Sequence, residues 1–196
     1  MSAIVATDTR SRVERARRRG QSLVEFALSS VVLVLLFGGL VDLTRAIHYA
    51  DVLQSAAREG ARAGAAFDTG SASNLNLDDA DIKAVVDDQL KAGGLAASIL
   101  KNPGVDCPAV ADGNAVRNPP YANAAFPGVA NQPWLYICYA NSGATDYPST
   151  PAANLAGQDL NVVLVMAYGP LTAAVPTPLG GAFGLAANWH VRVQGG

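Results

Sequence analysis

Residues 19–45 read RGQSLVEFALSSVVLVLLFGGLVDLTR, and this stretch decides how the rest of the chain is interpreted. Sixteen uncharged residues, 26–41, lie in its middle. As a helix they measure about 24 Å, short of the roughly 30 Å hydrocarbon core of a bilayer. Counting over residues 21–43 gives 23 residues and about 34 Å, which is enough to span. We therefore predict a transmembrane helix over residues 21–43, with Glu25 about one turn inside it.

The segment before this helix is strongly basic. Residues 1–19 hold six arginines and two acids, a net charge of +4, whereas the remainder of the chain carries −6. Arginine on one flank of a span favours a cytoplasmic position for that flank, which predicts that the C-terminal part lies outside the cytoplasmic membrane. The arginines nearest the helix, which would set this topology, are Arg15, Arg17, Arg18 and Arg19. A cleaved secretory signal is the alternative, but the nearest small-residue site, at 61–63, comes twenty residues after the apolar run.

The composition excludes several classes of protein. Half of the 196 residues are hydrophobic and 15% are charged, against about 25% charged in an average protein, so the chain is not disordered. A net charge of −2 argues against a nucleic-acid partner. All 11 prolines lie in residues 103–178. The first hundred residues can therefore be helical without interruption, while the second half must turn often.

Glu25 places a carboxylate in the predicted span, and two interpretations of it are open. The side chain could extend to the lipid headgroups, or it could pair with a cation on a partner. A carboxylate in the bilayer costs free energy and usually marks a function, so we favour the partner.

Three pieces of this sequence combine into a specific pattern. They are RGQSLVEFAL at 19–28, GGLVDLTR at 38–45 and QSAAREGAR at 54–62. Over about 45 residues, 19–64, the chain resembles the TadE-like pilus-assembly proteins, the minor pseudopilins of tight-adherence (Flp-type) pili. Where many relatives carry a proline early in the apolar run, this chain has SSV at 29–31, which leaves no proline to kink the helix there.

The resemblance implies how the segment is processed and used. Gly20 would be the last residue of a leader removed by an aspartic prepilin peptidase, and Gln21 would become the new N-terminus. Glu25, followed by Phe26, would then serve in assembly and axial register, with the Gln21 ammonium as a possible cationic partner for Glu25 in the same or a neighbouring chain. The implied partners are the membrane, the peptidase, other pilins and pseudopilins, and the inner-membrane secretion platform with its ATPase.

Beyond the membrane the helix is expected to continue to residue 66. Small or apolar residues recur there at helical spacing, and the stripe becomes mostly Ala and Gly toward its C-terminal end. Such a stripe lets another backbone approach closely, which could be the domain's own sheet or a neighbouring subunit. We expect His48 on this helix to have a packing or surface role and to bind no metal.

The second half predicts one more helix and several strands. Acids at 78–81 would cap and begin a helix of about fifteen residues that ends near 93–94; capping is favoured over a calcium site because the EF-hand spacing is missing. Residues 134–139, 160–168 and 188–193 are rich in β-branched and aromatic residues and predict strands. Long loops are expected over residues 103–133 and 169–187.

The expected fold is α+β: a long N-terminal transmembrane helix continues into a small pilin-like extracytoplasmic domain with a second helix and an antiparallel sheet. The domain limits are predicted as a basic leader (1–20), a transmembrane helix (21–43), its extracytoplasmic continuation (44–66) and an α+β domain (67–196).

Cys107 and Cys138 are the only cysteines, and both fall in the part predicted to be extracytoplasmic. An oxidising compartment permits a disulfide between them, which we favour over two free thiols. On the chain-entropy model, closing this loop would stabilise the protein by roughly 3.7 kcal/mol.

No enzyme signature is present. The sequence lacks the common nucleophile, metal-ligand and phosphate-loop motifs, and His190 is expected to be structural. We therefore expect no catalytic residue, metal, cofactor or small-molecule substrate. Two functions remain: a TadE-like minor pseudopilin that takes part in pilus assembly, and a signal-anchored extracytoplasmic binding module unrelated to pili.

Overall fold

The structure is a computed structural model that describes residues 5–74, 77–101, 126–139, 156–171 and 183–195. Within the first helix, side chains are described from Gln21 onward. The chain divides into two compact units, Met1–Leu43 and Thr44–Gly196, and each is described by itself.

Helix α1 (Val5–Ala65) runs through the first unit and into the second. It contains no proline, which is why nothing interrupts its hydrogen-bond ladder. The helix begins before the residue 21 that we predicted, because the basic segment that precedes it is already helical from Val5. By length and composition, the part over Gln21–Ala65 could cross a membrane: its most apolar window has a mean hydropathy of 2.3, and among the described residues none of that window is buried.

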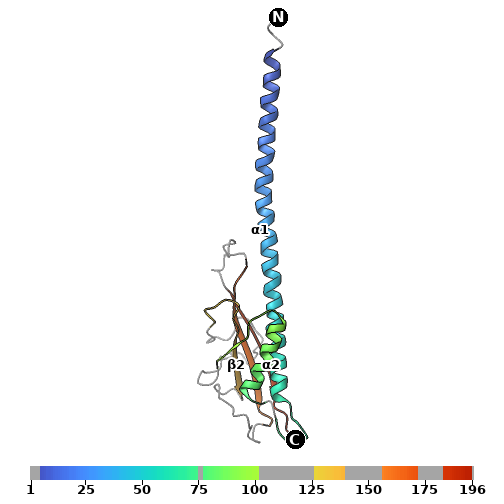
Figure 1. Cartoon of the computed structure of the whole chain (residues 1–196), viewed down its shortest axis with the longest axis vertical. Helices are drawn as coiled ribbons and strands as arrows, with labels where there is room; N and C mark the ends of the chain where they lie inside the picture. The colour runs from blue at the N-terminus through green and yellow to red at the C-terminus, as the bar shows by residue number, and fades with distance from the viewer. Residues whose placement is uncertain (1–4, 75–76, 102–125, 140–155, 172–182, 196) are drawn as a thin grey trace. The chain divides into compact units, whose positions relative to one another are not determined.

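The second unit adds a second helix and four strands to the end of α1 (Figure 1). Helix α2 (Asp79–Ala92) begins where Asp78 accepts a hydrogen bond from the Ala80 amide, at 2.6 Å, and Gly93 caps its C-terminus. Gly94 follows with φ +79°, a left-handed conformation that glycine adopts without strain. The predicted helix, its acidic cap and its glycine stop are confirmed.

The strands form one sheet in the order β1-β2-β3-β4. They are β1 (Ile99–Leu100), β2 (Trp134–Tyr139), β3 (Asp159–Tyr168) and β4 (Phe183–Arg192). The last three pair antiparallel as predicted, whereas β1 pairs parallel with β2 and makes the sheet mixed. Together with α1 and α2 the sheet completes the expected α+β fold.

Two details of the sheet differ from the sequence prediction. The strand β1 was missed because two residues are too short to show a pattern. Strand β4 begins at Phe183, inside the loop predicted over residues 169–187. Its first half includes Gly184, Ala186 and Ala187, which have low strand propensity. Gly184 is needed there because a Cβ would lie 2.5 Å from the Phe126 ring.

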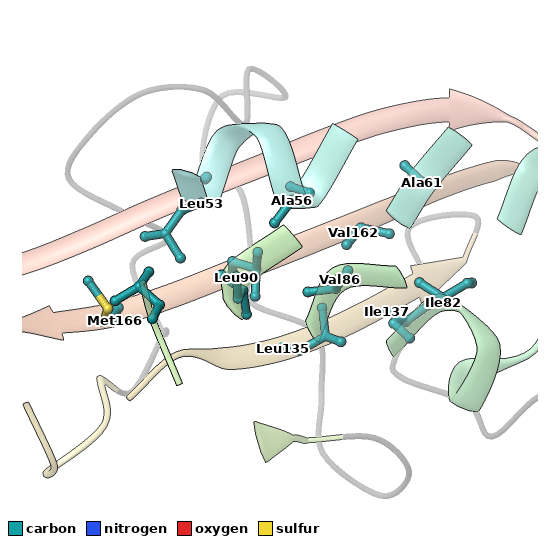
Figure 2. Close-up of a cluster of buried hydrophobic side chains, with 14 of the residues drawn as sticks. Leu53, Ala56, Ala61, Ile82, Val86, Leu90, Leu135, Ile137, Val162 and Met166 are labelled. Atoms are coloured by element: carbon teal, nitrogen blue, oxygen red, sulfur yellow. The ribbon is translucent and has the colours of Figure 1, made fainter. Parts of the chain in front are cut away.

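The main core of the second unit lies between the helices and one face of the sheet. Figure 2 shows side chains of α1, α2, β2 and β3 gathered in one cluster. Ten of its members are Leu53, Ala56, Ala61, Ile82, Val86, Leu90, Leu135, Ile137, Val162 and Met166. Strand β3 is buried along nearly its whole length, as its continuous apolar run predicted. A smaller cluster around Tyr136, Cys138, Val163 and Val165 occupies the other face.

The small residues of α1 provide a close contact with α2. A Cβ at Gly60 would lie 2.5 Å from Val86 Cγ2, and a Cβ at Gly64 would lie 2.6 Å from Ile82 Cδ1. The Ala and Gly stripe therefore packs within its own domain, chiefly against α2, with Leu160 of the sheet 3.1 Å from the Gly64 position. The stripe does not extend to Ile47, which is 56% exposed.

Asp87 joins α2 to the start of β1 through a buried polar network. One carboxylate oxygen accepts hydrogen bonds from the Ser98 amide and hydroxyl, both at 2.7 Å, and the other accepts from Lys83. Burial alone would raise the pKa of this carboxyl group, but the hydrogen bonds from Lys83 and Ser98 and the Lys83 charge outweigh it and hold the pKa below its usual value.

Asp87 is therefore expected to stabilise the fold only while it is ionised. Because its folded pKa is depressed, its contribution is present above the unfolded-state value of 3.8 and is lost as pH falls through the lower folded value. We expect Asp87→Asn to cost about 2 kcal/mol near neutral pH, and the difference from wild type to shrink in acid. Denaturant unfolding across pH measures this, with Asp88→Asn, an exposed neighbour on α2, as the control. Equal losses from the two substitutions would contradict the network.

Candidate assembly segment

The predicted processing junction lies inside α1. Gly20 and Gln21 are both helical, and the Gln21 side chain is exposed. Arg15, Arg17, Arg18 and Arg19 belong to the same helix by backbone, but their side chains lie outside the described part. Cleavage after Gly20, and the topology attributed to these arginines, stay predictions.

Glu25 and Phe26 are exposed on the next turn of α1. Phe26 is 72% exposed, and Glu25 makes no hydrogen bond or ion pair with the described residues of its own chain. The helix continues unbroken past residues 29–31, where Ser30 donates its hydroxyl to the Ala27 carbonyl at 2.9 Å. The carboxylate is therefore available to a partner outside this chain.

The apolar part of the first unit is exposed in the part of the chain that the structure describes. Its large hydrophobic side chains are exposed on all sides of the helix, by 47% to 72%. They are Leu23, Val24, Phe26, Leu28, Val31, Val32, Leu33, Val34, Leu35, Leu36, Phe37, Leu40, Val41 and Leu43. A helix that is apolar all round requires a lipid or protein surround, and this supports membrane anchoring.

The later part of the same helix has the opposite character. Ala56, Ala57, Gly60 and Ala61 are buried in the second unit. The charged residues between them face outward: Arg58 lies 3.9 Å from Glu59 and stacks over Trp189, with its guanidinium carbon 6.0 Å from the ring centre. In the string AAREGAR at 56–62, small residues that pack in the core therefore alternate with charged residues near the surface, as expected for a helix that is buried on one side.

A cation and three aromatic rings meet where α1 enters the second unit. Arg45 donates to the Tyr49 hydroxyl at 3.0 Å and lies 5.4 Å from that ring's centre. Tyr49 contacts Tyr168, whose ring centre lies 6.0 Å away, and Phe183 lies 5.0 Å beyond Tyr168. Sequence reasoning missed this group, because three distant segments contribute to it. The only local signal was the Arg45–Tyr49 spacing of four residues on one helix face.

The two histidines have hydrogen-bonding partners. His48 Nε2 lies 3.2 Å from the Gly93 carbonyl, and His190 Nδ1 lies 2.7 Å from an Asp159 carboxylate oxygen. Each ring thus contacts a group of its own chain, and the structural role expected from the sequence stays a prediction for both histidines. Among the described residues, no group of three or more His, Cys, Asp or Glu side chains is arranged to hold a metal ion.

Cys138, on β2, is disulfide-bonded. No free cysteine occurs in the described part of the chain. Cys107, the partner that the sequence favours, lies outside the described residues, and its pairing with Cys138 stays a prediction.

Comparison with known proteins identifies one segment of the chain. No curated protein and no solved structure matches it. A family model does match the chain, over a segment that includes both the exposed apolar part of α1 and most of its packed continuation. Residues 20–62 match the family described as TadE-like protein, which confirms the resemblance drawn from RGQSLVEFAL and AAREGAR.

Proposed function

We propose that this chain is a TadE-like minor pseudopilin, a membrane-inserted structural subunit that takes part in assembly of tight-adherence pili and so in adhesion and surface colonisation. One observation carries the proposal: the matched segment, residues 20–62, has two halves of opposite environment. Its first half is an apolar helix with exposed hydrophobic side chains and an exposed carboxylate, and its second half anchors a folded domain. A subunit that joins a bundle of like helices needs both.

In this proposal α1 crosses the cytoplasmic membrane once. The arginine-rich N-terminus stays in the cytoplasm, because translocating it would be costly, and the second unit lies outside. A prepilin peptidase removes the leader at the cytoplasmic face, and other pilins or pseudopilins then pack against the apolar helix. The inner-membrane platform and its ATPase supply the work of assembly. The protein itself is not an enzyme and needs no cofactor.

Processing tests this proposal directly. We expect protein extracted from membranes of a strain with the prepilin peptidase to begin at Gln21, and its intact mass to equal that of residues 21–196. Gly20→Leu should retain the leader, because the new side chain crowds the scissile backbone. Gly39→Leu, the same change further along α1, should be processed normally.

A mass that includes Met1, or lacks Met1 alone, would contradict cleavage. Identical processing of the Gly20→Leu and wild-type chains would exclude Gly20 as the recognised residue.

A further inference from the structure

Among the described residues of the second unit, most of the exposed large hydrophobic side chains lie at one end. Ile47, Val129, Leu171 and Phe183 are 56%, 66%, 65% and 40% exposed. They come from four separate segments of the chain, so no local sequence run explains their grouping.

Contacts around Tyr168 bring these segments together. The Asn131 amide donates to the Ala167 carbonyl at 2.7 Å, and the Gly169 amide donates to the Asn131 side chain at 3.1 Å. These bonds hold the turn that contains Val129 beside the end of β3. Leu171 follows two residues after Gly169 and so lies close to the same turn. On the other side of β3, Phe183 is the direct partner of Tyr168.

The opposite end of the sheet is polar. There Asp159 pairs with His190, and Asp159 lies across from Arg192 in the β3–β4 register. The adjoining turn presents Asp68, whose carboxylate accepts hydrogen bonds from Gly70 and Ser71. Of the described residues in this half, Trp189 is an exposed large hydrophobic residue, and the Arg58 guanidinium lies over its ring. The apolar side chains are therefore concentrated at one end.

Chain connectivity identifies what this apolar end faces. Tyr49, which contacts Tyr168, lies six residues after Leu43, or about 9 Å along a helix. If the span ends near Leu43, the Tyr168 end of the sheet lies next to the bilayer surface. Aromatic rings paired with basic side chains are common at the membrane surface, and this end has two such pairs. Arg45 lies over the Tyr49 ring, and Lys101 lies 3.7 Å from the Trp134 ring centre.

We propose that the end of the second unit defined by Ile47, Val129, Leu171 and Phe183 docks on the outer surface of the lipid bilayer. This inference rests on the membrane insertion proposed above. The apolar side chains enter the boundary between headgroups and acyl chains, while Arg45 and Lys101 remain at headgroup level. Asp51, exposed on α1 two residues beyond Tyr49, marks the water side. Docking fixes the folded unit against the membrane instead of leaving it tethered.

Spin labels on the full chain in lipid nanodiscs test this docking. Labels at Val129 and Leu171, both largely exposed, should be more accessible to oxygen than to an aqueous nickel complex. Labels at Asp68 and Arg62, at the polar end, should show the reverse. A label at Leu35 reports whether the span itself is in lipid. Val129→Asp with Leu171→Asp should shift the Phe183 label toward water without unfolding the protein.

Each outcome decides the matter. Lipid contact at Leu35 with water at both Val129 and Leu171 would overturn docking and leave insertion intact. Water at Leu35 would overturn insertion and docking together. Labels at Val129 and Leu171 shielded from both probes would show a protein contact at this end and also overturn the proposal.

Discussion

Replacing Glu25 by Ala is expected to abolish co-assembly of this chain with other pilins while leaving its fold and membrane insertion intact. Glu25 is exposed and makes no hydrogen bond or ion pair with the described residues of its own chain. Nothing in the described fold depends on it, and removing a charge from a span makes insertion easier. Its loss should therefore be felt only where another chain supplies the partner.

The expected size of the effect follows from the surroundings of the pair. In a bundle of apolar helices, the carboxylate and a cation such as the Gln21 ammonium satisfy each other at one axial position only. A buried charge left without its partner costs about 3–5 kcal/mol, which corresponds to a factor of more than a hundred in association. Slippage by one turn would incur this cost, so the pair sets the register of the helices.

Crosslinking in membranes, followed by recovery of pilin adducts, measures this effect. Glu59→Ala is the matched control, because it removes the same side chain from the same helix and matched segment. Glu59→Ala should give wild-type adducts, because the ion-pair partner of Glu59 is Arg58 of the same chain, at 3.9 Å. If Glu25→Ala also gives wild-type adducts, the helix is only a tether, and the alternative of a signal-anchored binding module becomes the better description.

Local features of the sequence were enough to predict much of the fold. The absence of proline before residue 103 predicted an unbroken first helix. Asp78 and Gly93 predicted the limits of α2, because capping depends on residues within one turn. The β-branched runs predicted β2 and β3 closely, since both are buried and their side chains directly determine the pairing.

Features that depend on distant partners were not predictable in the same way. The small residues at Gly60 and Gly64 indicated a close approach, but only the fold shows that the approaching element is chiefly α2. Strand β4 extends through Gly184 and Ala186, whose low strand propensity is overcome by ten paired positions with β3. The Arg45 and Tyr49 cluster needs Tyr168 and Phe183, which come from segments more than a hundred residues later.

The candidate assembly segment rests on a different kind of signal. Glu25 and Gly20 were identified from a pattern of residue types at fixed spacing, and the family match covers both. What the pattern cannot contain is the second chain that would pair with Glu25. The observation that favours such a partner is that Glu25 is exposed and makes no ion pair with the described residues of its own chain.

Gly60→Leu is expected to destabilise the second unit by about 3 kcal/mol or more, at the upper end of overpacking effects. Even a Cβ at this position would lie 2.5 Å from Val86 Cγ2, and Val86 is fully buried. Val86 cannot rotate away easily because its branched Cβ restricts it in a helix. The two helices must therefore separate, which disturbs the core around Ile82 and Leu90.

Gly39→Leu provides the matched control for this prediction, because a Cβ at Gly39 would have nothing within 4 Å. Denaturant unfolding of the full chain in detergent micelles should show a lowered midpoint for Gly60→Leu and an unchanged one for Gly39→Leu. A cycle of Gly60→Ala with Val86→Ala locates the cause: the double variant should lose less stability than the sum of the single ones, since removing the Val86 methyl groups makes room for the new Cβ. Additive losses would mean that the two helices do not approach at this point, and the small-residue stripe would then remain open to a neighbouring subunit.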